Sequence, residues 1–291
     1  MNQAKWGKFH KVAGVKFTPA DWCETIDGGQ AFTWFKTENA NEFEGGFSDV
    51  AAKVKLQSKS VQISFLDGAD ERRCLKKFSE YIDAHTDYEA IRTSLERSGD
   101  IHMKNALKIY PSLRILRQNP SEAIVCFICS SSKRIVQIKQ CVKLLSEKFG
   151  THLGGNFYKI PDFETLANAQ LKDILECKLG FRARYLKETA EKIVSEKFNP
   201  LSLREMPYQD AKKYLVSLSG IGDKVADCIL LFGCSRLEAF PVDTWIRQAM
   251  CQLYNTENDV KKIRAYAAQK FPSYAGFAQQ LIFATKRNAL M

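Results

Sequence analysis

The chain has 291 residues, of which 45% are hydrophobic and 26% are charged, a composition that excludes a disordered or collagen-like chain. Its formal charge of +10 favours a polyanionic partner, although a solvated basic surface accounts for it equally well. The sequence contains neither an apolar leader nor a window as long as a membrane span. We therefore expect an intracellular protein without a membrane partner, in the cytoplasm or nucleoid, or in the nucleus of a eukaryote.

Alternating apolar residues dominate positions 14–66. Phe32 and Trp34 lie two apart, as do Val61 and Ile63, and this period is typical of half-buried antiparallel strands. After this segment the apolar residues recur every three or four positions to the end of the chain, which is the period of helices. The pattern predicts an α+β fold with the sheet first.

Capping residues predict where several helices begin and end. Asn119 precedes Pro120 and has Glu122 three residues on, so a helix with a capping box is expected there. Further helices are expected over 135–149, 162–179, 183–198 and 209–218. Since no low-complexity linker interrupts the chain, we predict two parts that pack together. These are an N-terminal antiparallel sheet domain with following helices (1–115) and a mainly helical domain (116–291).

The segment 214–231 is the most informative for chemistry, because two predicted helices meet there at Gly220-Ile-Gly222. Both glycines can adopt positive φ and have no Cβ, so their backbone N–H groups, backed by a helix dipole, can approach an anion. An ordinary helix–helix turn is the alternative. Lys224 lies in the first turn of the second helix, where the helix dipole disfavours a cation. This placement suggests a functional role for Lys224, and it favours the neutral, nucleophilic form of the amine.

Asp243 follows Lys224 by nineteen residues, within Pro241-Val-Asp243-Thr-Trp245. Its simplest role is to cap the helix that follows. A carboxylate near Lys224 could also accept a proton or stabilise positive charge that develops on a sugar. The two roles are compatible.

The pairing of L-x-x-L-x-G-I-G-x-K-x-A-D with P-V-D resembles the helix-hairpin-helix (HhH-GPD) DNA glycosylases, and Lys224-Val-Ala-Asp-Cys228 resembles their 8-oxoguanine DNA glycosylase/AP lyase branch. The resemblance covers nearly the whole chain. It implies that Lys224 attacks the sugar of a flipped nucleotide, expels the base, forms a Schiff base and nicks the strand by β-elimination, with Asp243 assisting. The implied partner is double-stranded DNA containing 8-oxoguanine, and we expect a monomer.

The same resemblance implies a pocket for the base. Gly29 matches the position whose carbonyl accepts the N7 hydrogen of 8-oxoguanine, which guanine lacks, so guanine would be rejected by unpaired polar groups. Gln279 is assigned to the Watson–Crick edge, and Phe283 and Cys228 are assigned to the two faces of the base. Taken alone, Gly29 would be interpreted as a strand turn, and Phe283 and Cys228 as core residues.

Contacts to DNA are also implied by the resemblance. Phe181 is expected to wedge into the base stack and Arg182 to address the opposite base, although a basic helix start would explain both residues. The hairpin glycines Gly220 and Gly222 are expected at a phosphate. Trp245, where many relatives have histidine, could stack near the backbone or pack.

The segment 129–137 departs from the family pattern. Ser132 stands where better-known eukaryotic members carry asparagine, and Gln137 stands where they carry arginine. We therefore expect weaker discrimination of the opposite base. Lys133 and Arg134 are expected at phosphates, with a solvated helix start as the alternative.

Cofactor expectations are few. The nine cysteines suggest reduced thiols, and Cys126-x-x-Cys129 lies in an apolar run that favours core packing. The related endonuclease III branch holds an iron–sulfur cluster on C-terminal cysteines, and this chain has none after Cys251. We expect no required cofactor, no iron–sulfur cluster and no side-chain metal site, while the resemblance implies a structural cation on hairpin carbonyls near Leu218 and Ile221.

Two alternative functions remain at this stage. One is a glycosylase of the same family that removes another oxidised base with the same lysine and aspartate. The other is a helix-hairpin-helix protein that binds DNA without catalysis, in which Lys224 would contribute only to affinity.

Overall fold

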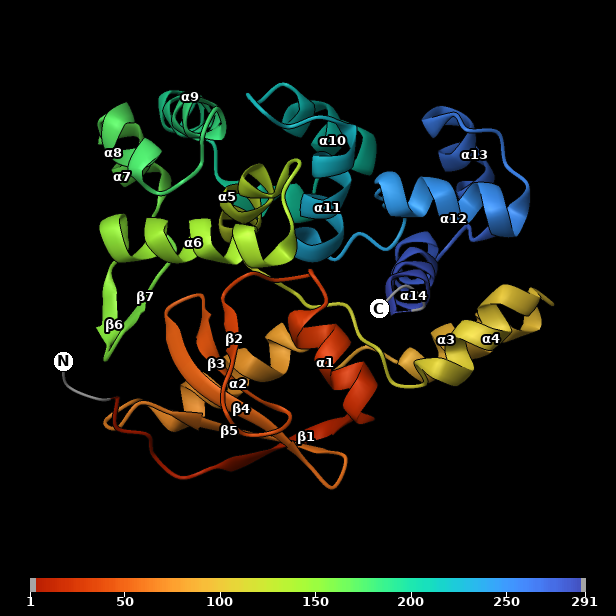
Figure 1. Cartoon of the computed structure of the whole chain (residues 1–291), viewed down its shortest axis with the longest axis horizontal. Coiled ribbons are helices and arrows are strands. Elements are labelled where there is room, and N and C mark those ends of the chain that lie inside the picture. Colours follow the sequence, from red (N-terminus) through yellow and green to blue (C-terminus); the bar gives the residue numbers. More distant parts are fainter. Residues whose placement is uncertain (1–3, 289–291) are drawn as a thin grey trace.

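A five-stranded antiparallel sheet forms the N-terminal part of the fold, and helices cover the rest (Figure 1). The computed structural model describes residues 4–288. The strands occur in the spatial order β1-β5-β4-β3-β2. Their bounds are β1 His10–Lys16, β2 Trp34–Lys36, β3 Glu42–Phe47, β4 Val50–Gln57 and β5 Ser60–Phe65. The predicted α+β fold, with the sheet first, is confirmed.

Two helices, α1 (Pro19–Asp27) and α2 (Glu71–Tyr81), contribute to the sheet core together with the aromatic residues of the strands. The alternation over 14–66 predicted strands and did not predict the helix α1. Thr18 caps this helix by accepting the Asp21 N–H at 3.2 Å. The fully buried Trp22 and Ile26 lie four residues apart, so this short segment follows the helical period inside a stretch dominated by alternation.

Most of the remaining helices lie above the sheet in Figure 1, while α3 and α4 lie to its right. The helices are α3 Tyr88–Arg97, α4 Ile101–Ile109, α5 Pro120–Ser130, α6 Ile135–Phe149, α7 Phe163–Asn168, α8 Leu171–Glu176, α9 Arg182–Ser195, η1 Pro200–Arg204, α10 Tyr208–Val216, α11 Asp223–Cys234, α12 Thr244–Tyr254, α13 Val260–Lys270 and α14 Ala275–Asn288. A small hairpin, β6 (His152–Gly154) and β7 (Phe157–Tyr158), was not predicted. The single helix predicted over 162–179 is instead the pair α7 and α8, because the chain is extended at Ala169 and Gln170.

The helical core is built around α5 and α11, which pack closely. A side chain added at Gly233 of α11 would place its Cβ 2.8 Å from the Cβ of Ala123 on α5, so glycine is required for this approach. The same core receives apolar residues from α3 and α4, including Ile91 and Met103. The helices α3 and α4, which precede position 115, therefore pack on the helical part of the molecule rather than on the sheet.

The start of α5 connects the two parts. Asn119 caps the helix by accepting the Ser121 N–H at 2.9 Å, and Pro120 is its first residue, as predicted. The predicted capping box is wrong, because the buried Glu122 does not turn back to the cap. Its Oε2 accepts the N–H of Ser48, 3.2 Å away in the β3–β4 turn. Burial raises the pKa of Glu122 to about 7, against the lowering effects of the Ser48 N–H and of Lys159.

This pKa predicts a pH dependence of stability. Because the folded pKa lies above the ordinary value of 4.5, the native state binds more protons than the unfolded state between these values. Stability should fall as pH rises from about 4.5 to 7, and above pH 7 the full cost of ionising the buried carboxyl should apply. Glu122→Gln keeps an acceptor for Ser48 and cannot ionise. We expect its free energy of unfolding to exceed wild type by about 3 kcal/mol at pH 8 and to match it at pH 4.

Urea denaturation of both proteins at the two pH values measures this effect. Glu205→Gln, at an exposed position, is the control and should change neither value. Equal stability of wild type and Glu122→Gln at pH 8 would contradict the prediction.

Candidate active site

The turn between α10 and α11 has the backbone geometry of a tight hairpin. Gly220 has φ +76°, and an added Cβ would lie 2.6 Å from the Cβ of Tyr185, so both conformation and space require glycine. Gly222 has φ −87° and caps α11 with open space around it. Of the two glycines, only Gly220 uses the positive φ that is open to this residue type. The open space at Gly222 still leaves the first amides of α11 approachable.

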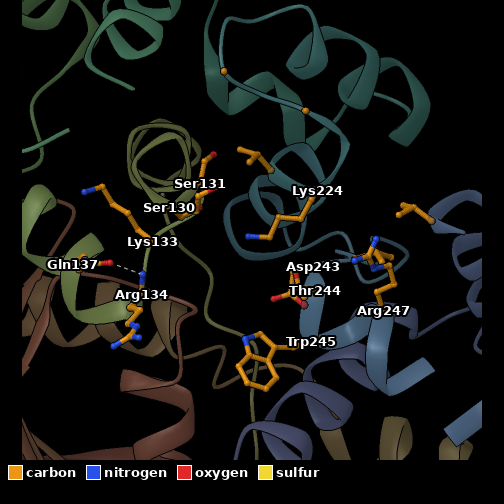
Figure 2. Close-up of a pocket in the computed structure, with 16 residues that line it drawn as sticks. Ser130, Ser131, Lys133, Arg134, Gln137, Lys224, Asp243, Thr244, Trp245 and Arg247 are labelled. Carbon is orange, nitrogen blue, oxygen red and sulfur yellow. Dashed lines mark hydrogen bonds between the residues drawn. The ribbon is translucent and has the colours of Figure 1, made fainter. Parts of the chain in front are cut away.

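A cleft of about 800 Å³ opens beside this hairpin (Figure 2). It is bordered by the α5–α6 loop, the hairpin and the first turns of α11 and α12. The residues that line it are Ser130, Ser131, Ser132, Lys133, Arg134, Gln137, Gly220, Gly222, Lys224, Val225, Val242, Asp243, Thr244, Trp245, Arg247 and Val260. The cleft thus brings together nine of the residues that the sequence singled out.

Lys224 and Asp243 lie in this cleft between its two side walls (Figure 2). The half-buried Lys224 places its ammonium nitrogen 5.9 Å from the centre of the Phe127 ring. Asp243 caps α12, its Oδ1 accepting the Ile246 N–H at 2.8 Å. Within residues 4–288 this carboxylate makes no other hydrogen bond or ion pair, so one oxygen remains free to act in the cleft. The capping role expected for Asp243 is confirmed.

Cys228 lies one turn after Lys224 and is buried. Burial raises the pKa of its thiol to about 11, the hydrogen-bonded Lys224 ammonium lowers it, and the charge of Asp243 raises it. All three groups are therefore close enough to interact. A neutral thiol at this position gives the amine a polarisable, uncharged neighbour.

Behind the cleft, α11 is held by a buried ionic cluster around Asp227, whose carboxylate is fully buried. It receives Lys212 Nζ at 2.7 Å, Arg264 Nη2 at 2.9 Å and the Tyr208 hydroxyl at 2.7 Å. Burial raises the pKa of Asp227, and the two cations lower it. The cluster ties α10, α11 and α13 together. The sequence analysis did not predict this cluster, although an acidic residue inside the apolar run of α11 indicates a buried charge that needs partners.

Cations stand on both sides of the Lys224–Asp243 pair in Figure 2, with Lys133 and Arg134 on one side and Arg247 on the other. Arg247 was not among the predicted residues. It follows Asp243 by four positions, the helical spacing that puts two side chains on one face, and this was the available signal. No hydrogen bond or ion pair engages its guanidinium within the described part of the chain, so it is free to bind an anion.

The α5–α6 loop is under backbone constraint. Ser132 has φ +52°, a region that asparagine tolerates better than serine. Lys133 donates from Nζ to the carbonyl of Lys178 at 3.1 Å. Gln137 accepts the Arg134 N–H at 3.0 Å and so caps α6. The proposed DNA contacts of these residues stay predictions, and the geometry shows that Gln137 also has a structural task.

Phe181 and Arg182 lie outside the lining of the cleft and differ from each other in exposure. Phe181 is 59% exposed and meets Tyr185 edge to face at 5.7 Å, so its ring is accessible for insertion. Arg182 is buried and donates to the carbonyls of Ser131 and Leu179, from Nε at 2.7 Å and from Nη1 at 3.1 Å. Its contact with the opposite base stays a prediction, and in this structure it positions the α5–α6 loop.

The four residues assigned to the base do not line the cleft in this structure of residues 4–288. Gly29 has φ +100°, and an added Cβ would lie 3.1 Å from Cδ1 of Ile135 at the start of α6. Gln279 is 5% exposed, and no partner for its buried Oε1 exists among the described residues. Phe283 is half-buried on the same helix. Recognition of a base by these residues and Cys228 stays a prediction.

Metal-binding groups are not evident. In residues 4–288 no cluster of three or more His, Cys, Asp or Glu side chains could hold a metal ion. At the hairpin, the Leu218 carbonyl accepts the Ile221 N–H at 3.3 Å and the Ser219 carbonyl accepts the Thr189 hydroxyl at 2.9 Å. A structural cation on the carbonyls of Leu218 and Ile221 stays a prediction, and no step below involves one. The described helices are also all too short or too polar to cross a bilayer.

Comparison with known proteins accounts for both parts of the chain. Residues 125–273 match the family model of the HhH-GPD superfamily base excision DNA repair proteins, and residues 15–124 match the 8-oxoguanine DNA glycosylase N-terminal domain. A probable N-glycosylase/DNA lyase of Methanothermobacter thermautotrophicus is 30% identical over 280 residues, which cover 85% of this chain and 88% of that relative.

Solved structures agree with these matches. The apo form of Clostridium acetobutylicum 8-oxoguanine glycosylase/lyase is 35% identical, with 97% of this chain and 98% of that chain covered and a TM-score of 0.85. The same enzyme in complex with double-stranded DNA containing cytosine opposite to 8-oxoguanine gives 32% identity, 99% and 100% coverage and a TM-score of 0.86. The similarity therefore extends over both the sheet and the helices.

The buried cluster behind the cleft generates a stability prediction. Asp227→Asn removes the charge that compensates Lys212 and Arg264 in a fully buried setting, so we expect a loss of about 3 kcal/mol or more in the free energy of unfolding. Urea denaturation measures it, with Asp210→Asn at an exposed position of α10 as the matched control. A loss no larger than that of the control would show that the cluster does not stabilise the fold.

Proposed function

The chain belongs to the HhH-GPD superfamily of base excision DNA repair proteins, and on that premise we propose how its residues carry out the reaction. It is an N-glycosylase/DNA lyase that removes 8-oxoguanine from double-stranded DNA. The observation that carries our assignment of the active site is the position of Lys224 and Asp243 in one cleft flanked by cations. The finer roles given below are part of the proposal.

Lys224 is the proposed nucleophile. Its neutral amine adds to C1′ of the lesion nucleotide, the N-glycosidic bond breaks, and the electron pair leaves with the base, which takes up a proton. The sugar opens to an iminium ion on the lysine. Loss of a C2′ proton then expels the 3′ phosphate by β-elimination, which nicks the strand. Water then hydrolyses the imine, which returns the free amine of Lys224 and leaves an unsaturated aldehyde on the 3′ end of the nicked strand.

Asp243 is the proposed electrostatic partner of this step. As the N-cap of α12 its Oδ1 is fixed by the Ile246 N–H, so the carboxylate needs no reorganisation when positive charge develops on the sugar. Its unengaged oxygen can stabilise that charge or take the proton that the amine loses on addition. A carboxylate that is already in place adds less to the activation free energy than one that must move into place during the reaction.

Recognition of the base requires that the nucleotide leave the stack, since the sugar carbon is otherwise shielded. We assign the carbonyl of Gly29 to the N7 hydrogen of 8-oxoguanine, Gln279 to the Watson–Crick edge, and Phe283 and Cys228 to the faces of the base. The unpaired, buried Oε1 of Gln279 supports this, because such an atom is costly unless a ligand satisfies it.

The cations around the cleft are proposed to bind the two DNA strands. Lys133 and Arg134 lie on one side and Arg247 on the other, while Gly220 and Gly222 present the start of α11 to a phosphate. Phe181, exposed on α9, is the proposed wedge, and Trp245, 43% exposed, is proposed to stack along the backbone. We also propose that the chain acts as a monomer.

Replacing the nucleophile tests the mechanism. We expect Lys224→Gln to lower single-turnover excision of 8-oxoguanine by about a thousandfold or more and to abolish borohydride trapping of the protein on the lesion duplex. The matched control is Lys104→Gln, at an exposed position of α4. Unchanged activity with slightly weaker binding would favour the alternative of a DNA-binding protein without catalysis. Competition with duplexes that carry other oxidised bases would detect a different preferred lesion.

Opposite-base selectivity is expected to be relaxed, because Ser132 and Gln137 replace an asparagine and an arginine of better-known relatives, and Gln137 is engaged as a helix cap. A bidentate base contact contributes roughly 1–3 kcal/mol of discrimination. We therefore expect single-turnover rates with C, A, G and T opposite the lesion to fall within about tenfold of one another. A strong preference for cytosine alone would refute this, and Gln137→Arg is expected to move the enzyme toward such a preference.

A further inference from the structure

The recognition turn at Gly28–Gly29 is joined to the C-terminal helix by one arginine. Arg287, in the last turn of α14, donates from Nη1 to the carbonyl of Gly28 at 3.0 Å, across 259 positions of sequence. Its Nη2 forms an ion pair with the carboxylate of Glu24 in α1. A single guanidinium therefore links the sheet part of the molecule to the helix that carries Gln279 and Phe283.

This contact is sequestered from solvent. The side chain of Glu24 is 2% exposed and that of Arg287 is 19% exposed, so the pair lies in a setting where charge-assisted hydrogen bonds are strong. Removing either partner would leave the other charged and buried, which is costly. The arginine also uses two different nitrogens for two different acceptors, a fork geometry that lysine cannot reproduce.

The turn itself is packed against Glu24. The N–H of Gly28 donates to the Glu24 carbonyl at 3.0 Å. An added Cβ at Gly28 would lie 2.1 Å from that carbonyl oxygen and 2.5 Å from the Glu24 carboxylate. Holding Glu24 and the Gly28 carbonyl in place thus fixes the backbone one residue before Gly29, which has a φ of +100°.

On α14, Arg287 belongs to a stripe of residues spaced four apart. Gln279, Phe283 and Arg287 lie on one face of the helix, and the Arg287 guanidinium carbon is 5.8 Å from the centre of the Phe283 ring. The arginine therefore touches the proposed base-stacking residue on its own helix and the recognition turn on the other part of the chain.

We propose that Arg287 is a positioning residue for recognition of the damaged base. It holds the Gly29 carbonyl at a set distance from Phe283 and Gln279, so that the three act as one pocket. This inference rests on the proposed function, because the base contacts of these residues were assigned there. Since a displacement on the order of 1 Å can cost about a hundredfold in rate, loosening the contact should impair removal of the base.

The test separates recognition of the base from the chemistry at the sugar. An abasic site has no base to hold, so its cleavage by β-elimination needs Lys224 but not the base pocket. We expect Arg287→Ala to slow single-turnover excision of 8-oxoguanine by about tenfold or more and to leave cleavage of a preformed abasic duplex unchanged. Arg287→Lys, which retains the charge beside Glu24 and offers one nitrogen, should give an intermediate excision rate.

Matched variants keep the test decisive. Lys286→Ala removes a neighbouring charge, whose contact is with Gln252, and should leave both activities unchanged. Glu24→Gln removes the partner and should reproduce the selective loss if Arg287→Ala does not fold. Equal loss of both activities in the soluble variants, or no loss of either, would overturn the proposal. If the wild-type protein cleaved neither substrate, the proposed function itself would be rejected.

Discussion

The position of α11 is the constraint on which the active site depends. This helix carries Lys224, and its inner side holds Asp227, a fully buried carboxylate in contact with Lys212, Arg264 and Tyr208. Buried charges are stable only when they are paired and hydrogen-bonded, so α10, α11 and α13 have little freedom to shift relative to one another. An amine that must reach one carbon of a sugar benefits from such a rigid support.

Several residues of the site combine a structural task with a chemical one. Asp243 caps a helix and lies in the same cleft as Lys224, the proposed nucleophile, and Gly220 provides both the hairpin conformation and the close approach to Tyr185. Gln137 caps α6 from a position assigned to the opposite base, and Arg182 supports the loop beside it. Because the same contacts hold the fold and shape the cleft, the site is preorganised before DNA arrives.

Local signals in the sequence predicted local structure, and their errors have physical causes. The cap at Asn119 was predicted correctly, but Glu122 left the expected capping box because a backbone N–H of the sheet, at Ser48, competes for its carboxylate. The helix α1 was missed because its nine residues show the helical spacing only once, at Trp22 and Ile26, inside an alternating stretch. Gly222 is free to adopt positive φ, but as a helix cap it has an ordinary extended conformation.

The sequence by itself determined the α+β order of elements, the hairpin, and the spacing of Lys224 and Asp243, since these depend on periodicity, caps and short motifs. The tertiary structure alone decided that Arg247 joins the cleft, that Asp227 is the centre of a buried cluster, and that Arg287 meets Gly28 from the other end of the chain. Such pairings depend on how whole elements pack. Such packing cannot be inferred from a short stretch of sequence, because the free energy that favours it is the sum of contacts over the entire core.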